Sequence, residues 1–84
     1  MGDVYVYILY SESKAKYYTG YSEDTKKRLI QHNLGETRST KSGIPWVQVW
    51  QSQAMTKTEA LLLERKIKKR GAKRFLEDES SKTN

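Results

Sequence analysis

The sequence contains no cysteine among its 84 residues, which excludes disulfide bonds and zinc sites built from thiolates. Its longest apolar run, residues 4–10, is far shorter than the roughly 20 residues that cross a bilayer. No basic and apolar segment of the signal-peptide type opens the sequence. From these absences we expect a soluble, cytoplasmic protein with no membrane partner.

Acidic residues are also few, since 16 Lys and Arg stand against 10 Asp and Glu and give a net charge of +6. Hydrophobic residues make up 36% of the chain, which is enough for one modest core and one domain. An isoelectric point near 9.6 favours a polyanionic partner, although the same charge could serve only to keep the surface soluble.

Three segments have the β-branched and aromatic composition of strands: residues 4–10, 17–21 and 46–50. The first is apolar at both of its alternating sets of positions, which predicts a central strand covered on both faces. The polar residues 11–16 then predict a hairpin connection between the first two strands.

Two segments are predicted to be helices. The first begins after the capping hydroxyl of Ser22 and runs to about residue 33, before Gly35. The second covers residues 57–70, and it starts with the capping-box spacing of Thr56 and Glu59.

The order strand, strand, helix, strand, helix predicts an α+β fold, in which helices flank a small, mainly antiparallel sheet of three strands. We expect one domain over residues 1–76, with a short last helix over 72–76. Residues 77–84 lack apolar side chains and are expected to form a flexible tail.

Glu64 is the main anomaly of the second helix. On a helical wheel it falls within the apolar arc that contains Ala60, Leu63 and Ile67. A carboxylate on a buried face is costly unless a cation or strong donors meet it. Glu64 is therefore either a structural partner of a neighbouring Lys or Arg, or a metal ligand or catalytic carboxylate.

Arg28 and His32 lie four residues apart on the first helix and therefore share one flank. Taken alone, Arg28 is one more solvated cation, and His32 is an ordinary histidine near a helix C-terminus. Two tyrosine-rich strands precede them, and all six tyrosines lie within the first 21 residues. These tyrosines either fill the core or supply a phenol that handles protons beside a cation.

Several of these residues form an ordered set. Tyr5-Val6-Tyr7 is followed by Tyr18-Thr19-Gly20, then by the segment 28–33 that begins with Arg28 and contains His32, and finally by Glu64. Over residues 3–76 the sequence resembles the GIY-YIG nuclease superfamily, with Tyr5 in place of the first glycine and Thr19 in place of the isoleucine. It looks closest to small stand-alone members of that superfamily, and it is similar to the N-terminal nuclease domain of the excinuclease members.

The resemblance implies a role for each matching residue. Tyr7 would be the general base or its partner, and Tyr18 would help to position the attacking water. Arg28 would stabilise the phosphate as charge develops, and His32 would assist proton movement at the phenol. Glu64 would be the single acidic ligand of a divalent metal.

The function implied is a metal-dependent endonuclease that hydrolyses phosphodiester bonds of DNA, with structured or branched DNA among the candidate substrates. One Mg²⁺ or Mn²⁺ ion, weakly bound without substrate, would be the cofactor. We expect a monomer, and a protein partner could direct it to its substrate. The expected phosphate contacts are basic residues of the first helix and of the polar stretch 36–45: Lys26, Lys27, Arg38 and Lys41.

Two other functions remain open at this point. A non-catalytic nucleic-acid-binding module would use the aromatic strands to stack bases, but it leaves Glu64 without a purpose. A small basic interaction protein would depend on its charge alone. Strand cleavage that requires Mg²⁺ or Mn²⁺ distinguishes the nuclease from both.

Overall fold

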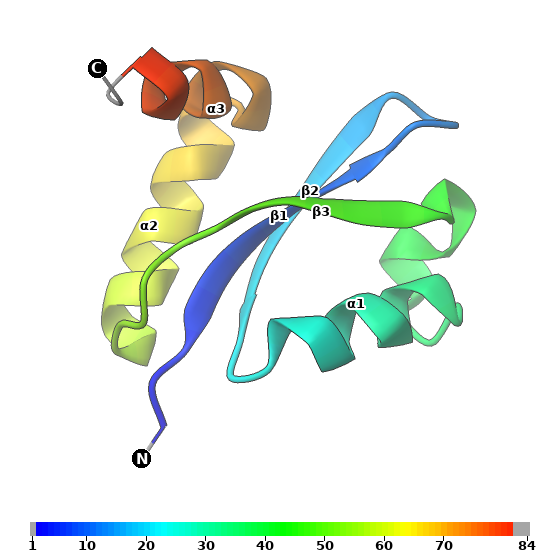
Figure 1. The fold of residues 1–84 in the computed structure, drawn as a ribbon, viewed down its shortest axis with the longest axis horizontal. Helices are drawn as coiled ribbons and strands as arrows, with labels where there is room; N and C mark the ends of the chain where they lie inside the picture. Colours follow the sequence, from blue (N-terminus) through cyan, green and yellow to red (C-terminus); the bar gives the residue numbers. More distant parts are fainter. Residues whose placement is uncertain (1, 82–84) are drawn as a thin grey trace.

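Three antiparallel strands form the sheet in a computed structural model that describes residues 2–81 (Figure 1). Their bounds are Tyr5–Ser11 (β1), Lys16–Ser22 (β2) and Trp46–Gln51 (β3), and their order in the sheet is β2-β1-β3. Strand β1 is therefore central, as its apolar composition predicts. The predicted α+β fold with a three-stranded sheet is confirmed.

The two faces of β1 carry separate cores. Val6 and Ile8 pack with Ala60, Ile67 and Phe75 of the C-terminal helices. On the other face, a second cluster contains Tyr7, Leu9 and Trp46, against which Tyr18, Leu29 and Ile44 pack. The alternation of side chains along one strand thus separates Tyr7 from the larger aliphatic core.

The helices confirm the predicted order. They cover Thr25–Asn33 (α1), Lys57–Arg70 (α2) and Ala72–Ser81 (α3), with a 3₁₀ helix over Arg38–Gly43 (η1) inside the polar stretch before β3. The capping box of Thr56 and Glu59 is present at the start of α2. Gly35, which follows the predicted end of the first helix, and Gly71, which follows α2, both adopt positive φ angles, as helix terminators commonly do.

The predicted start of α1 is wrong by two residues. Asp24 is the N-cap, because its carboxylate accepts a hydrogen bond of 3.0 Å from the backbone N–H of Lys27. The hydroxyl of Ser22 instead accepts from the backbone N–H of Asp24, at 3.0 Å. A carboxylate two residues further on therefore takes the capping position expected for the serine.

The predicted end of the last helix is also wrong, because α3 continues from residue 76 to Ser81 through part of the expected tail. Phe75 anchors the helix by packing edge-on against Trp50, with ring centroids 5.0 Å apart. Arg70 donates two hydrogen bonds to the carboxylate of Asp78, at 2.9 and 3.1 Å. These contacts join α3 to the body of the protein, and residues 82–84 of the expected tail lie outside the described residues.

Candidate active site

The hydroxyl of Tyr7 and the Nε2 atom of His32 lie 3.0 Å apart, within hydrogen-bonding distance. Tyr7 comes from the central strand and is 1% exposed, while His32 comes from the last turn of α1 and is fully buried. His32 thus lies near the C-terminus of α1, as expected, but it is buried and has a phenol as its partner.

Thr40 contacts the other ring nitrogen of His32. Its hydroxyl donates to the carbonyl oxygen of Thr37 at 3.3 Å, and it lies 2.8 Å from Nδ1 of His32. In the tautomer in which the Thr40 hydroxyl donates to Thr37, Nδ1 of His32 donates to Thr40. Nε2 of the neutral ring then keeps a lone pair and accepts the hydrogen bond from Tyr7.

Gly20 makes room for the Tyr7 phenol. It pairs with Tyr7 across the β1–β2 ladder, and a Cβ atom at this position would lie 2.9 Å from the Tyr7 hydroxyl oxygen. Any larger residue would have to displace that hydroxyl from its place beside His32. The close packing of the Tyr7 phenol therefore explains the glycine at the end of the segment Tyr18-Thr19-Gly20.

Tyr18 lies against the same pair of side chains. Its ring centroid is 5.0 Å from that of His32 and 6.4 Å from that of Tyr7. Tyr18 is half-buried, so it reaches the surface, whereas Tyr7 and His32 do not. Three of the five residues that the sequence singles out thus form one cluster.

The surroundings shift the pKa values of Tyr7 and His32 in directions that keep both groups neutral. Burial, and next the neighbouring Tyr18, raise the pKa of Tyr7 to about 12, although the charge of Arg28 partly offsets this. Burial, and next Arg28, lower the pKa of His32 below its ordinary value. At neutral pH the phenol therefore holds a proton while the imidazole can accept one.

The raised pKa of Tyr7 predicts a loss of stability in alkali. The folded state holds the phenolic proton more tightly than the unfolded chain, whose tyrosine pKa is 10.0. The stabilisation is complete below pH 10 and is lost as the pH rises toward about 12. A shift of this size amounts to about 3 kcal/mol in the free energy of unfolding. Chemical denaturation between pH 9 and 12 measures it, and Tyr7→Phe, which has no phenol to titrate there, should lack this part of the decline.

Arg28 belongs to the same electrostatic environment. Its side chain is half-buried on α1 and donates a hydrogen bond of 2.9 Å to the side-chain oxygen of Gln31. Its charge acts on both Tyr7 and His32. The interpretation of Arg28 as a fully solvated surface cation is therefore wrong.

Glu64 lies on α2, whose buried residues pack on the face of the sheet opposite Tyr7. Its negative charge contributes a small upward shift to the pKa of Tyr7. Its carboxylate lies 3.0 Å from Nζ of Lys68, one helical turn on, and Lys68 in turn lies beside Tyr18 along the edge of the sheet. The ion-pair partner considered for Glu64 is thus present, although Lys68 is 60% exposed.

Comparison with known proteins identifies the family of the chain. The model of the GIY-YIG catalytic domain matches residues 3–77 of the chain. The chain belongs to the GIY-YIG family. The resemblance expected from the paired tyrosine motifs is therefore confirmed, and the family is one of nucleases.

The relatives of this GIY-YIG chain include small proteins and one much longer protein. It is 42% identical over 65 residues to a UPF0213 protein of Staphylococcus saprophyticus, a match that covers 76% of the chain and 78% of that protein. It is 51% identical over 47 residues to a structure-specific endonuclease subunit SLX1 homolog of Cryptosporidium parvum. That match covers 50% of the chain but 11% of the Cryptosporidium protein. No solved structure gives a significant match.

The donor set of this GIY-YIG site fits a hard divalent cation. Within residues 2–81, no three His, Cys, Asp or Glu side chains gather into a metal-binding cluster. Glu64 offers a partly exposed carboxylate, and a single carboxylate suits Mg²⁺, which keeps several waters and takes other ligands from a substrate phosphate. Zinc, which takes three or four protein ligands, does not match this set.

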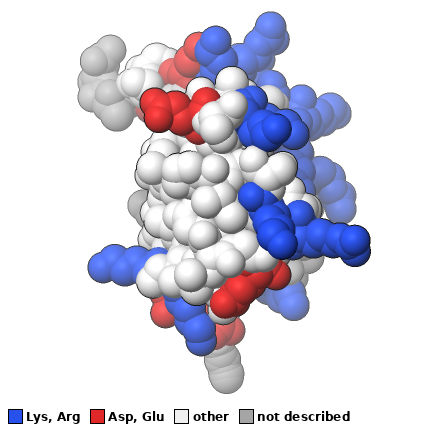
Figure 2. Space-filling model, turned by 90° about the vertical axis from the view of Figure 1, so that its right-hand side faces the viewer, with Lys and Arg blue, Asp and Glu red and all other residues white. Residues whose placement is uncertain are grey.

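The four residues predicted to contact phosphates all lie on the surface. Lys26 and Lys27 are exposed on α1, and Arg38 and Lys41 are exposed on η1. On the face seen in Figure 2, Lys and Arg side chains crowd along one side, whereas Asp and Glu occur in small groups. No helix in the described part of the chain is long and apolar enough to cross a membrane.

Two residues that support the site do not stand out in the sequence. Thr40 is one of several hydroxyl residues in a stretch whose composition suggests a phosphate-binding loop, yet it is buried and holds His32. Asn33 bonds both the N–H and the carbonyl of Trp46, at 2.6 and 3.0 Å, and so fixes the end of α1 to β3. The hydroxyl-rich composition is the only available signal for Thr40, and Asn33 gives none.

Proposed function

We propose that this chain is an endonuclease that hydrolyses phosphodiester bonds of DNA with the help of one divalent metal ion. The hydrogen-bonded series from Tyr7 through His32 to Thr40 carries the proposal. It places a phenol and an imidazole within hydrogen-bonding distance, as proton transfer between them requires. The name of the SLX1 homolog supports structured DNA as the substrate class.

The proton transfers follow from the order of these groups. Hydrolysis requires a water to lose a proton while its oxygen attacks phosphorus and the bond to the leaving oxygen breaks. In the proposed mechanism the Tyr7 oxygen accepts that proton as its own phenolic proton passes to Nε2 of His32. Thr40 keeps the ring oriented throughout, because Nδ1 stays bonded to its hydroxyl.

The roles of Tyr18 and Arg28 are assigned from the exposure of their side chains. Tyr7 is almost wholly buried, so water and phosphate must arrive past Tyr18 and Arg28, which are half-buried. Tyr18 is therefore assigned to orienting the water. Arg28 is assigned to the phosphate oxygens, whose negative charge grows in the transition state.

Glu64 is the residue assigned to hold the metal. The bound ion would stabilise negative charge on the phosphate and leaving oxygens. Lys68, which pairs with Glu64 in the free protein, is exposed enough to turn away from the carboxylate.

Arg28→Ala should lower the cleavage rate about 10²- to 10³-fold while changing the dissociation constant of DNA much less, because the guanidinium acts mainly on transition-state charge. Single-turnover cleavage, measured beside DNA binding in chelator, separates the two effects. Arg28→Lys keeps the charge without the planar fork and should give an intermediate rate. Equal losses in rate and affinity would show that Arg28 acts only in binding.

A non-catalytic nucleic-acid-binding module is the second candidate. The Glu64–Lys68 ion pair favours it, because a carboxylate already neutralised by lysine needs no metal. Incubation of the purified protein with labelled single-stranded, nicked, flapped and branched DNAs, in Mg²⁺, Mn²⁺ or chelator, decides between the two. The endonuclease cleaves at least one of them only with metal, whereas the binding module leaves every strand intact.

A further inference from the structure

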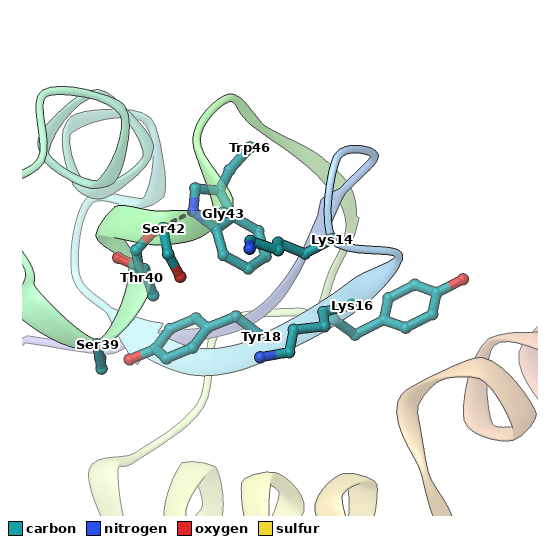
Figure 3. A pocket seen from close by; sticks show the side chains of 9 residues that line it. Lys14, Lys16, Tyr18, Ser39, Thr40, Ser42, Gly43 and Trp46 are labelled. Atoms are coloured by element: carbon teal, nitrogen blue, oxygen red, sulfur yellow. Dashed lines mark hydrogen bonds between the residues drawn. The ribbon is translucent and has the colours of Figure 1, made fainter.

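A pocket of about 190 Å³ lies between the β1–β2 hairpin and η1, directly beside the proposed catalytic centre (Figure 3). Tyr18 forms part of its wall, so the pocket and the centre share one side chain. Thr40, which orients His32, lines it as well. Tyr18 therefore joins this pocket to the proposed catalytic centre.

The open side of the pocket carries hydrogen-bond donors and positive charge. Lys14 and Lys16 stand on the hairpin, and Ser39 and Ser42 face them from η1. In Figure 3 the ammonium group of Lys14 extends across the pocket toward Ser42. No Asp or Glu is among the residues that line the pocket, all of which the structure describes. This combination of ammonium groups and hydroxyls suits an anion.

The inner wall is rigid. Trp46 is 5% exposed and donates a hydrogen bond of 2.7 Å from Nε1 to the carbonyl oxygen of Thr40. A Cβ atom at Gly43 would collide with the indole ring, so this glycine permits the ring to sit against η1. With so little of the indole exposed, Trp46 itself offers a nucleic-acid base no ring face on which to stack.

We propose that this pocket binds a phosphate group of the nucleic-acid strand beside the one that is cleaved, with Lys14 and Lys16 as its charged contacts. The inference rests on the proposed function, since it assigns the pocket to the same strand. It adds hairpin residues to the expected phosphate contacts, which the sequence placed on α1 and in the stretch 36–45. This phosphate is either an internal or a terminal phosphate of the nucleic acid, and both present the same anionic oxygens to the pocket.

The test is DNA binding in chelator, where no cleavage occurs, by the wild type and by the double variant Lys14→Ala/Lys16→Ala. The variant should bind about tenfold more weakly, and the slope of log K against log salt should fall by about one. Lys57→Ala/Lys73→Ala is the matched control, because it removes the same charge from exposed positions of α2 and α3. The control should lose no more than about threefold in affinity.

Neutral methylphosphonate linkages, introduced one at a time, then locate the phosphate. At one position the neutral linkage should weaken DNA binding by the wild type but not by the Lys14/Lys16 variant. If instead a 5′-phosphate on the DNA strengthens binding by the wild type but not by the variant, the pocket holds a strand end. Equal losses by the variant and its control would overturn the pocket assignment and leave the endonuclease proposal standing. A wild type that binds none of the DNAs would overturn both.

Discussion

Replacement of Glu64 by glutamine should abolish metal-dependent cleavage and leave binding of DNA in chelator nearly unchanged. The amide keeps the size of the side chain but loses the charge that a hard cation requires. Since a metal contributes several kcal/mol to transition-state stabilisation, the rate should fall by about 10³-fold or more. Single-turnover cleavage in saturating Mg²⁺ measures the loss, and anisotropy in chelator measures the binding.

The structure changes what a stability measurement can show for this variant. A buried partner charge stranded by the loss of Glu64 would cost roughly 3 to 5 kcal/mol. Lys68 is instead 60% exposed, so breaking this ion pair should change the free energy of unfolding by less than about 1 kcal/mol. Lys68→Ala is the matched control: it breaks the same pair and should keep its metal-dependent cleavage. A Glu64→Gln protein that cleaves as fast as the wild type would exclude this residue as the metal ligand.

The second large effect is expected for Tyr7→Phe. Removal of the hydroxyl takes away the group proposed to accept the water proton and leaves Nε2 of His32 without its hydrogen-bond partner. Cleavage should slow by about 10²- to 10⁴-fold, the range typical of a lost general base. The fold should survive, because the ring still fills the second core and a lost buried hydrogen bond costs only about 1 to 2 kcal/mol.

Tyr10→Phe provides the comparison for this variant. It removes a phenolic hydroxyl from the same strand, where Tyr10 packs on Tyr17 with ring centroids 4.8 Å apart. Rates are measured at saturating metal after both variants are shown to melt cooperatively. Should Tyr7→Phe cleave as fast as Tyr10→Phe, the phenol of Tyr7 takes no part in the proton transfer.

The elements of the fold were largely predictable because their signals are local. The β-branched and aromatic composition of residues 46–50 predicts β3, and the spacing of Thr56 and Glu59 predicts the start of α2. The start of α1 is a local error, because Asp24 caps the helix in place of Ser22. The last helix continues past residue 76, where Asp78 pairs with Arg70 across the turn at Gly71, a contact that no pattern within residues 77–84 reveals.

The sequence points to Tyr7, Tyr18 and His32 but not to how they are arranged. Family motifs single out Tyr7, Tyr18 and His32, and the wheel position of Glu64 singles it out independently. The direct bond between Tyr7 and His32 joins residues 25 positions apart, and it depends on the sheet register and on the packing of α1. Thr40 is fixed by the 3₁₀ turn of η1, so its role could not be separated from that of the hydroxyls around it.

The most direct test of the central claim is cleavage of labelled nicked, flapped and branched DNA by the wild type beside Glu64→Gln, prepared identically. The proposed endonuclease predicts product strands from the wild type with Mg²⁺ or Mn²⁺, none with chelator, and none from the variant under any condition. Product that forms equally with both proteins would show that the cleavage does not come from this site. Tight binding by the wild type with every strand intact in both metals would contradict the enzyme and identify a binding module.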